Sequence, residues 1–104
     1  MAKVSAVAKL VVKPDKADDF VNQWDDVLDH VKNNEPGTEQ YAIHRSNKDS
    51  NVFYVTELYK DQAALDAHSG SDAFAGLVGK LGDYIESADL DFCTPIRSAK
   101  GLDL

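Results

Sequence analysis

The residues best suited to acid–base chemistry in this sequence lie between positions 57 and 68. Glu57 and Tyr59 share one face of a predicted strand with Phe53 and Val55, because side chains alternate between the two faces of a strand. A carboxylate among aromatic rings is poorly hydrated and can act as a general base. The structural alternative is that Glu57 pairs with a neighbouring strand or helix end. Glu57 is therefore a candidate base, and Tyr59 a candidate donor to a substrate oxygen.

His68 is a second candidate base. It follows Ala64 and Leu65 at helical spacing, on the inward side of a helix that Asp61 can cap. Imidazole is the usual proton carrier near neutral pH, although a single histidine on an apolar face is often a core residue. His68, Glu57 and Tyr59 are thus the expected catalytic residues.

The other two histidines are weaker candidates. His44 lies on the opposite face of its predicted strand from Tyr41, and His30 is expected to be solvated beside the polar face of the first helix. The three histidines are too dispersed for the spacing of a metal-binding helix. No metal site is expected.

Aromatic and apolar side chains can build the pocket around these groups. Tyr41 and Tyr59 offer phenolic donors on aromatic bodies, although tyrosine is also common in protein cores. The residues expected to bind a substrate are Tyr41, Phe53, Trp24, Phe74 and Leu77. No glycine-rich phosphate loop, dinucleotide fingerprint or nucleophile elbow occurs in the sequence, so no cofactor is expected.

The elements that position these residues follow the order strand, helix, strand, strand, helix, strand. Alternating apolar residues predict the first strand, apolar residues at three- and four-residue spacing predict the helices, and clusters of Pro, Gly, Asn and Asp predict the turns. The expected ranges are strands at 4–12, 41–45, 52–59 and 88–96, one helix from Pro14 to Asn34, a short helix from Asp61, and a helix from Ser71 to Ile85.

This βαββαβ order predicts an α+β, ferredoxin-like fold with a four-stranded antiparallel sheet and the helices on one face, since right-handed crossovers place the helices together. The other sheet face is left uncovered. Val7 and Val11 lie there, and a contiguous apolar face is rarely exposed in a soluble monomer. A homodimer joined through this face is therefore expected.

Length and charge limit the remaining possibilities. The 104 residues suit one domain, spanning 1–104, and the formal net charge of -7 disfavours nucleic acid and anionic membrane surfaces as partners. The only cysteine, Cys93, cannot form an internal disulfide, and no export signal or membrane-spanning run is visible. A cytoplasmic location is the default expectation.

The stretch from residue 35 to residue 74 resembles the antibiotic-biosynthesis monooxygenase family of small dimeric α+β barrel proteins. The residues that carry this resemblance are Glu35-Pro36-Gly37, Tyr41, His44-Arg45, Glu57-Leu58-Tyr59-Lys60-Asp61, Ala64-Leu65, Ala67-His68 and Phe74. The resemblance implies a ferredoxin-like subunit, a homodimer and, in many members, a cofactor-independent oxygenase acting on phenolic or quinol substrates.

Three functions are compatible with these residues. In a cofactor-independent monooxygenase, His68 or Glu57 would remove a proton from a phenolic or quinol substrate, which then reacts with O₂, while Tyr59 and Tyr41 hold the anion. An isomerase of a small phosphorylated dicarbonyl would use the same groups. Lys60 could assist the phosphate, but it alternates away from Tyr59 along the strand and is expected to face solvent. The third function is non-enzymatic binding of a small aromatic metabolite, or a role in stress tolerance.

Overall fold

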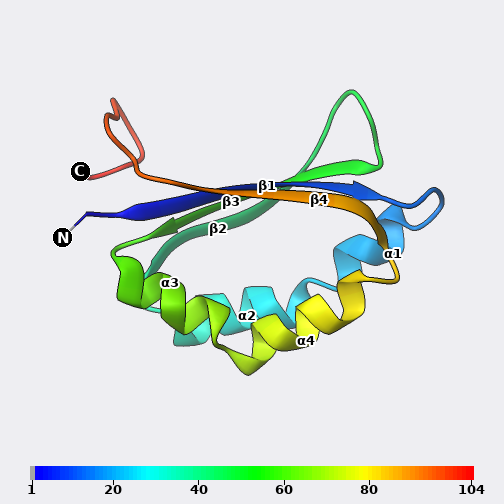
Figure 1. Ribbon diagram of the computed structural model, residues 1–104, viewed down its shortest axis with the longest axis horizontal. Coiled ribbons are helices and arrows are strands. Elements are labelled where there is room, and N and C mark those ends of the chain that lie inside the picture. Colours follow the sequence, from blue (N-terminus) through cyan, green and yellow to red (C-terminus); the bar gives the residue numbers. More distant parts are fainter. Residues whose placement is uncertain (1) are drawn as a thin grey trace.

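The computed structural model describes residues 2–104 and has a sheet with all its helices on one side (Figure 1). The elements are β1 (Val4–Val12), α1 (Ala17–Asn22), α2 (Asp25–Asn34), β2 (Thr38–Arg45), β3 (Val52–Tyr59), α3 (Gln62–Ser69), α4 (Asp72–Leu81) and β4 (Ile85–Cys93). The strands are antiparallel in the order β2-β3-β1-β4. The predicted α+β, ferredoxin-like fold is confirmed.

The strand register gathers the apolar residues on the helix side of the sheet. Ala8 pairs with Val55 and Leu10 pairs with Phe53, and all four residues are buried. Directly paired residues on antiparallel strands point to the same face, so each pair adds to one continuous surface. The helices cover this surface, and the core lies between the two layers.

The predicted first helix is two helices in the structure. Its apolar stripe continues across the break, but the amide groups of Gln23 and Trp24 donate to the carbonyl oxygens three residues earlier, at 3.1 and 3.3 Å. These tighter turns end α1 and leave Trp24 at the start of α2, where it is buried. The expectation that Asp15 lies in the helix is wrong, since its φ of 66° places it in a left-handed turn before α1.

The later boundaries are closer to expectation. The side chains of Asp61 and Ser71 accept hydrogen bonds from the amides of Ala64 and Phe74, which confirms both predicted helix caps. The last strand begins three residues earlier than predicted, so that Ile85 belongs to β4 and not to the preceding helix. β4 is an edge strand, as Pro95 allows, but it ends at Cys93, three residues before the predicted end at Ile96.

The face of the sheet away from the helices is partly apolar. Val7 and Tyr54 lie on it with 45% and 37% of their surface exposed. The segment after β4 turns back over this side of the sheet, close to Leu58, which is buried (Figure 1). Among the helices of residues 2–104, none is long and apolar enough to cross a membrane.

Candidate active site

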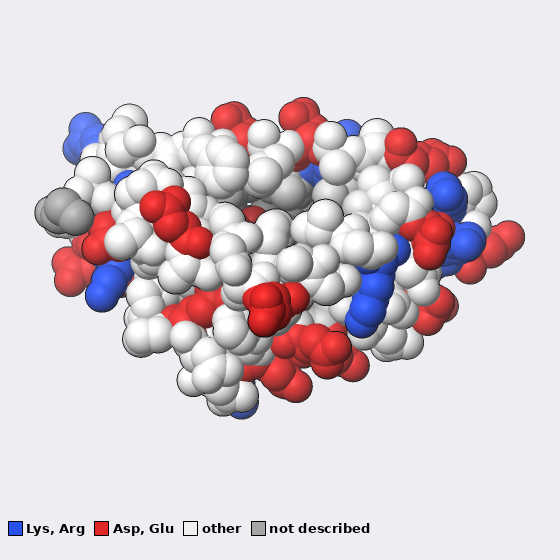
Figure 2. All heavy atoms as spheres, turned by 60° about the horizontal axis from the view of Figure 1, so that its bottom comes forward, with Lys and Arg blue, Asp and Glu red and all other residues white. Residues whose placement is uncertain are grey.

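A cavity of about 250 Å³ lies between the helix side of the sheet and the helices α3 and α4. All four strands contribute to it, and Trp24 closes it beside α2. Its lining residues are Ala8, Leu10, Trp24, Tyr41, Val55, Glu57, Leu65, His68, Ser69, Phe74, Leu77, Val78, Leu81, Ala88, Leu90 and Phe92. In Figure 2 the helix side of the molecule is hollowed near its centre, with acidic side-chain atoms visible inside. The lining is therefore mostly apolar with a few polar groups.

His68 is the most completely buried polar residue of this cavity, with 1% of its surface exposed. Its Nδ1 atom lies 2.9 Å from Oε1 of Glu35, while Nε2 is buried with no hydrogen-bond partner among residues 2–104. A carboxylate can only accept a hydrogen bond, so Nδ1 carries the proton and Nε2 is left as a free acceptor. The rings of Tyr41 and Phe74 pack around the imidazole, with centroids 4.8 and 5.0 Å from it. This environment suits a base that is held in one tautomer.

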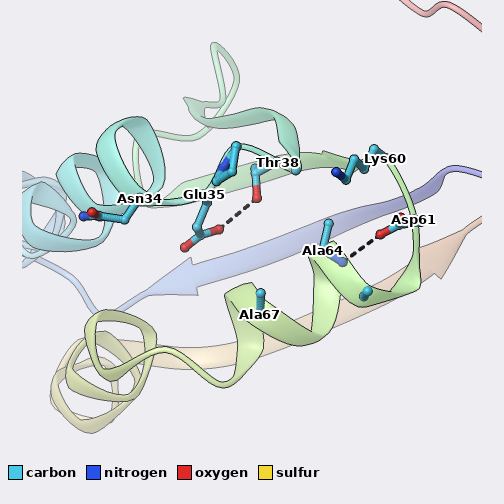
Figure 3. A pocket seen from close by; sticks show the side chains of 10 residues that line it. Asn34, Glu35, Thr38, Lys60, Asp61, Ala64 and Ala67 are labelled. Carbon is cyan, nitrogen blue, oxygen red and sulfur yellow. Dashed lines mark hydrogen bonds between the residues drawn. The ribbon is translucent and has the colours of Figure 1, made fainter.

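Glu35 belongs to the candidate site although its residue type and spacing do not single it out in the sequence, where it stands only within the Glu35-Pro36-Gly37 motif. Its side chain reaches back from the end of α2, where Oε1 accepts the hydroxyl proton of Thr38 at 2.8 Å (Figure 3). Oε2 lies 3.2 Å from Nε2 of His30. The expectation that His30 is simply solvated is therefore wrong, because its side chain is half-buried against a carboxylate. No local signal predicts these contacts, since the turn and β2–β3 set the distance to His68.

Glu57 and Tyr59 are hydrogen-bonded to each other. Both lie on the helix side of β3, where the Tyr59 hydroxyl donates to Oε1 of Glu57. Glu57 lines the cavity, whereas Tyr59 is fully buried behind it. Burial raises the pKa of Tyr59 far above its ordinary value, and the hydrogen bond to Glu57 raises it further. One carboxylate oxygen of Glu57 is thus already occupied by a neutral phenol.

Tyr41 stands in the cavity wall next to His68. Its burial, followed by the nearby carboxylates of Glu57 and Glu35, raises the pKa of Tyr41 well above its ordinary value. Tyr41 therefore stays a neutral phenol at neutral pH. In this form it can donate a hydrogen bond to an anionic oxygen, but it cannot serve as a base.

The other residues expected to bind a substrate divide into two groups. Trp24, Phe74 and Leu77 line the cavity, and Nε1 of Trp24 is buried with no hydrogen-bond partner in residues 2–104. Phe53 does not line it, because its ring packs in the core with a centroid 4.9 Å from that of Phe20. His44 also lies away from the cavity, on the other face of the sheet, with Nε2 3.1 Å from the Thr56 hydroxyl.

The charge of the cavity is as informative as its shape. Glu57 is its only acidic residue, and no Lys or Arg of residues 2–104 lines it. Lys60 faces a separate, open hollow beside the Glu35–Thr38 turn and α3 (Figure 3). Within residues 2–104, no three His, Cys, Asp or Glu side chains gather as the ligands of a metal ion would. The cavity therefore offers a base and neutral donors to a ligand, but no cation.

A family model described as "Antibiotic biosynthesis monooxygenase" matches residues 3–80 of the chain. The chain belongs to this family. The match covers every residue of the candidate site from Trp24 to Val78 and leaves out β4, which supplies Ala88, Leu90 and Phe92 to the cavity.

Two relatives support the family membership. The "Putative monooxygenase YcnE" of Bacillus subtilis is 33% identical over 84 residues, which cover 81% of this chain and 86% of the relative. A crystal structure titled as a "putative antibiotic biosynthesis monooxygenase" from Caulobacter crescentus is 31% identical, with a TM-score of 0.86 over 92% of each chain. Rv0793 from Mycobacterium tuberculosis, at 20% identity and a TM-score of 0.85 over 95% of this chain and 100% of its own, shows the shared fold.

Proposed function

We propose that the protein is a monooxygenase that uses O₂ to oxidise a small, uncharged phenol or hydroquinone, without a metal or an organic cofactor. The observation that carries this proposal is the state of His68, which lines the apolar cavity. Its buried Nε2 atom has no hydrogen-bond partner among residues 2–104, while Nδ1 is held by Glu35. The names of the relatives support the same reaction class.

The first step is a proton transfer. Nε2 of His68 takes the hydroxyl proton of the substrate, and the phenolate that forms is electron-rich enough to react with O₂ itself. The hydroxyl of Tyr41 and the indole N–H of Trp24 are the neutral donors of the cavity wall, and they stabilise the negative charge. In an apolar cavity these hydrogen bonds are stronger than in water.

The oxidation then balances without a further reactant. A ring carbon of the phenolate forms a bond to O₂, and the resulting peroxide receives the proton back from His68. The O–O bond breaks as the hydrogen on the same ring carbon leaves as a proton, which combines with the departing hydroxide. A phenol and O₂ thus give a quinone and water. Glu57 is the less suitable base, because the Tyr59 hydroxyl occupies one of its oxygens.

The charge of the cavity argues against the isomerase alternative. A phosphorylated dicarbonyl would meet the carboxylate of Glu57 with no Lys or Arg among the lining residues to neutralise its phosphate. Lys60, which could have served that purpose, lies in the other hollow. An uncharged aromatic ligand fits this lining better, and it is also the ligand that a non-enzymatic binding protein would take.

The test is oxygen consumption by metal-free, flavin-free protein with a panel of phenols and hydroquinones. Uptake of O₂ with matching quinone formation supports the proposal. Trp24 is the only tryptophan of the chain, so quenching of its fluorescence reports binding in the same samples. Quenching without O₂ uptake across the panel would show a binding protein and not an oxygenase, and proton exchange on a phosphorylated dicarbonyl would show an isomerase.

Two copies of the chain are proposed to associate through the helix-free sheet faces, in the cytoplasm. The exposure of Val7 and Tyr54 on that face supports the homodimer. An interface of roughly 1,600 Å² is the standard size for a stable complex. Light scattering of the dilute protein tests this, and a monomeric mass would reject it.

A further inference from the structure

Glu35 lies between two histidines of different exposure. On one side, Oε1 accepts a hydrogen bond from the Nδ1–H group of His68 at 2.9 Å. On the other side, Oε2 is buried and lies 3.2 Å from Nε2 of His30, although the two groups are not aligned as a hydrogen bond. The side chain of His30 is 28% exposed, compared with 2% for His68 and 4% for Glu35. The three groups form a continuous series from the cavity to the surface.

We propose that Glu35 and His30 carry protons between His68 and solvent. They act through His68 and do not contact the substrate. This inference rests on the proposed role of His68 as the base. Its value to the enzyme is that Nε2 is buried from water and a ligand in the cavity would exclude water further, so that Nδ1 is the route by which the ring exchanges protons with solvent.

Each transfer in this path balances. When Nε2 takes the substrate proton, the ring becomes an imidazolium beside the Glu35 carboxylate. Its Nδ1 proton passes to Glu35, which leaves a neutral ring protonated at Nε2 and a neutral carboxyl group. Rotation of the carboxyl group presents the proton to Nε2 of His30, and the imidazolium of His30 releases a proton to solvent. The reverse sequence returns a proton to Nδ1 when Nε2 gives its own to the product.

Among the described residues 2–104, no other ionisable group near His68 offers the same route. The rings of Tyr41 and Tyr59 lie 4.8 and 5.6 Å from the imidazole, but burial raises the pKa of both phenols, so they remain neutral. Glu57 is engaged by Tyr59 and faces the cavity. Thr38 donates its hydroxyl to Glu35 and so stabilises the carboxylate without competing for the His68 proton.

The experiment uses nuclear magnetic resonance on protein labelled with ¹⁵N-histidine, which has only three imidazole rings to assign. The ring nitrogen shifts of His68 give its tautomer, and saturation transfer from water gives the exchange rate of its Nδ1 proton. The rate is followed down a pH titration without substrate, because only a ring that carries protons on both nitrogens can pass its Nδ1 proton to Glu35 and remain neutral. A failure of the path therefore leaves the proposed oxygenase intact, and an inactive oxygenase leaves the path measurable.

The decisive variant is His30→Gln, which keeps a polar side chain but cannot pass on a proton as imidazole does. We expect it to slow exchange of the His68 Nδ1 proton by roughly tenfold or more, equivalent to about 1.4 kcal/mol on the barrier, with the tautomer unchanged. His44→Gln, on the other sheet face, is the matched control and leaves the rate as it is. An equal rate in His30→Gln and the unmodified protein, or a His68 ring without a proton on Nδ1, would overturn the proposal.

Discussion

The imidazole of His68 and the carboxylate of Glu35 are 33 residues apart in the sequence and 2.9 Å apart in the structure. The contact joins α3 to the end of α2 across the turn that leads into β2. It fixes the tautomer of the candidate base and at the same time ties two helices together. Mutations at either residue should therefore affect stability as well as chemistry, and the two effects need separate measurements.

The stability effect is accessible through a double-mutant cycle. Glu35→Ala leaves the neutral imidazole of His68 without its acceptor and should lower the free energy of unfolding by about 1–3 kcal/mol. His68→Ala leaves the buried carboxylate of Glu35 without this donor and should lower it by about 3–5 kcal/mol. The double variant should lose less than the sum, with a coupling of about 0.5–3 kcal/mol in urea unfolding. Glu35→Ala combined with His44→Ala is the control, and these two changes should be additive because His44 lies on the other sheet face. Full additivity in the first pair would show that the contact contributes nothing.

The chemical effect appears in the turnover of His68→Ala on any phenol that the protein oxidises. A general base contributes ~10²- to 10⁴-fold to the rate, whereas wall contacts act on the ground state and the transition state alike. The kcat should fall by this factor while the quenching of Trp24 fluorescence still reports binding. An unchanged kcat would remove the imidazole from the mechanism and leave Glu57 as the base to examine.

Trp24→Phe separates the indole N–H from the aromatic wall. Nε1 of Trp24 is buried without a hydrogen-bond partner among residues 2–104, which lowers the stability of the ligand-free folded protein. Removing this group therefore offsets part of the packing energy that is lost with the smaller ring. We expect a modest change in unfolding free energy but weaker binding of phenols, measured by calorimetry. Leu77→Val, which trims the same cavity without removing a donor, is the control. Equal loss of affinity in both variants would mean that the indole donates no hydrogen bond to the ligand.

The buried phenols predict a dependence of stability on alkaline pH. Because burial raises the pKa of Tyr41 in the folded chain above its unfolded value of about 10, folding keeps the proton that unfolding releases. This stabilisation is complete below about pH 10 and is lost as the pH rises above it towards the folded pKa. Urea unfolding at about pH 8 and about pH 11 should show a smaller difference in Tyr41→Phe than in the unmodified protein. The same difference in both proteins would contradict the prediction.

Two glycines should respond to alanine in opposite directions. A Cβ atom at Gly37 would lie 2.6 Å from Cβ of Ala64, so Gly37→Ala must push the turn away from α3 and should lower the unfolding free energy by about 1–3 kcal/mol. Gly79 lies inside α4 with open space around it, so Gly79→Ala should raise that free energy by about 0.5–1 kcal/mol. Thermal unfolding compares the two, and a stabilising Gly37→Ala would show that the turn is free to move.

The parts of the fold that depend on local chemistry could be predicted from the sequence. Alternation of apolar residues places β1, and single side chains at Asp61 and Ser71 mark the starts of the later helices. The break at Trp24 could not be predicted, because the apolar stripe runs through it without interruption. Its cause is the tighter hydrogen bonding of two backbone amides, which no residue type there requires.

The candidate site was predictable to a similar depth. Strand period and helix spacing were enough to place His68 and Glu57 on the cavity side. They could not reveal Glu35, whose partner is set by the turn and by the register of β2 on β3. Phe53 was wrongly expected in the cavity, because it shares a strand face with Glu57. The strand face alone does not determine whether a ring lines the cavity or packs in the core, where the Phe53 ring contacts Phe20.

The residues at the rim of the cavity and the residues assigned to proton chemistry come from different parts of the sequence. Val78, Leu90 and Phe92 line the cavity with about half of their surface exposed, and they come from α4 and the edge strand β4. The groups assigned to proton chemistry all come earlier, between Trp24 and His68. A library of codons restricted to residues 78–92 would therefore sample new substrate shapes while the acid–base groups stay untouched. Directed evolution could retune selectivity in one short cassette.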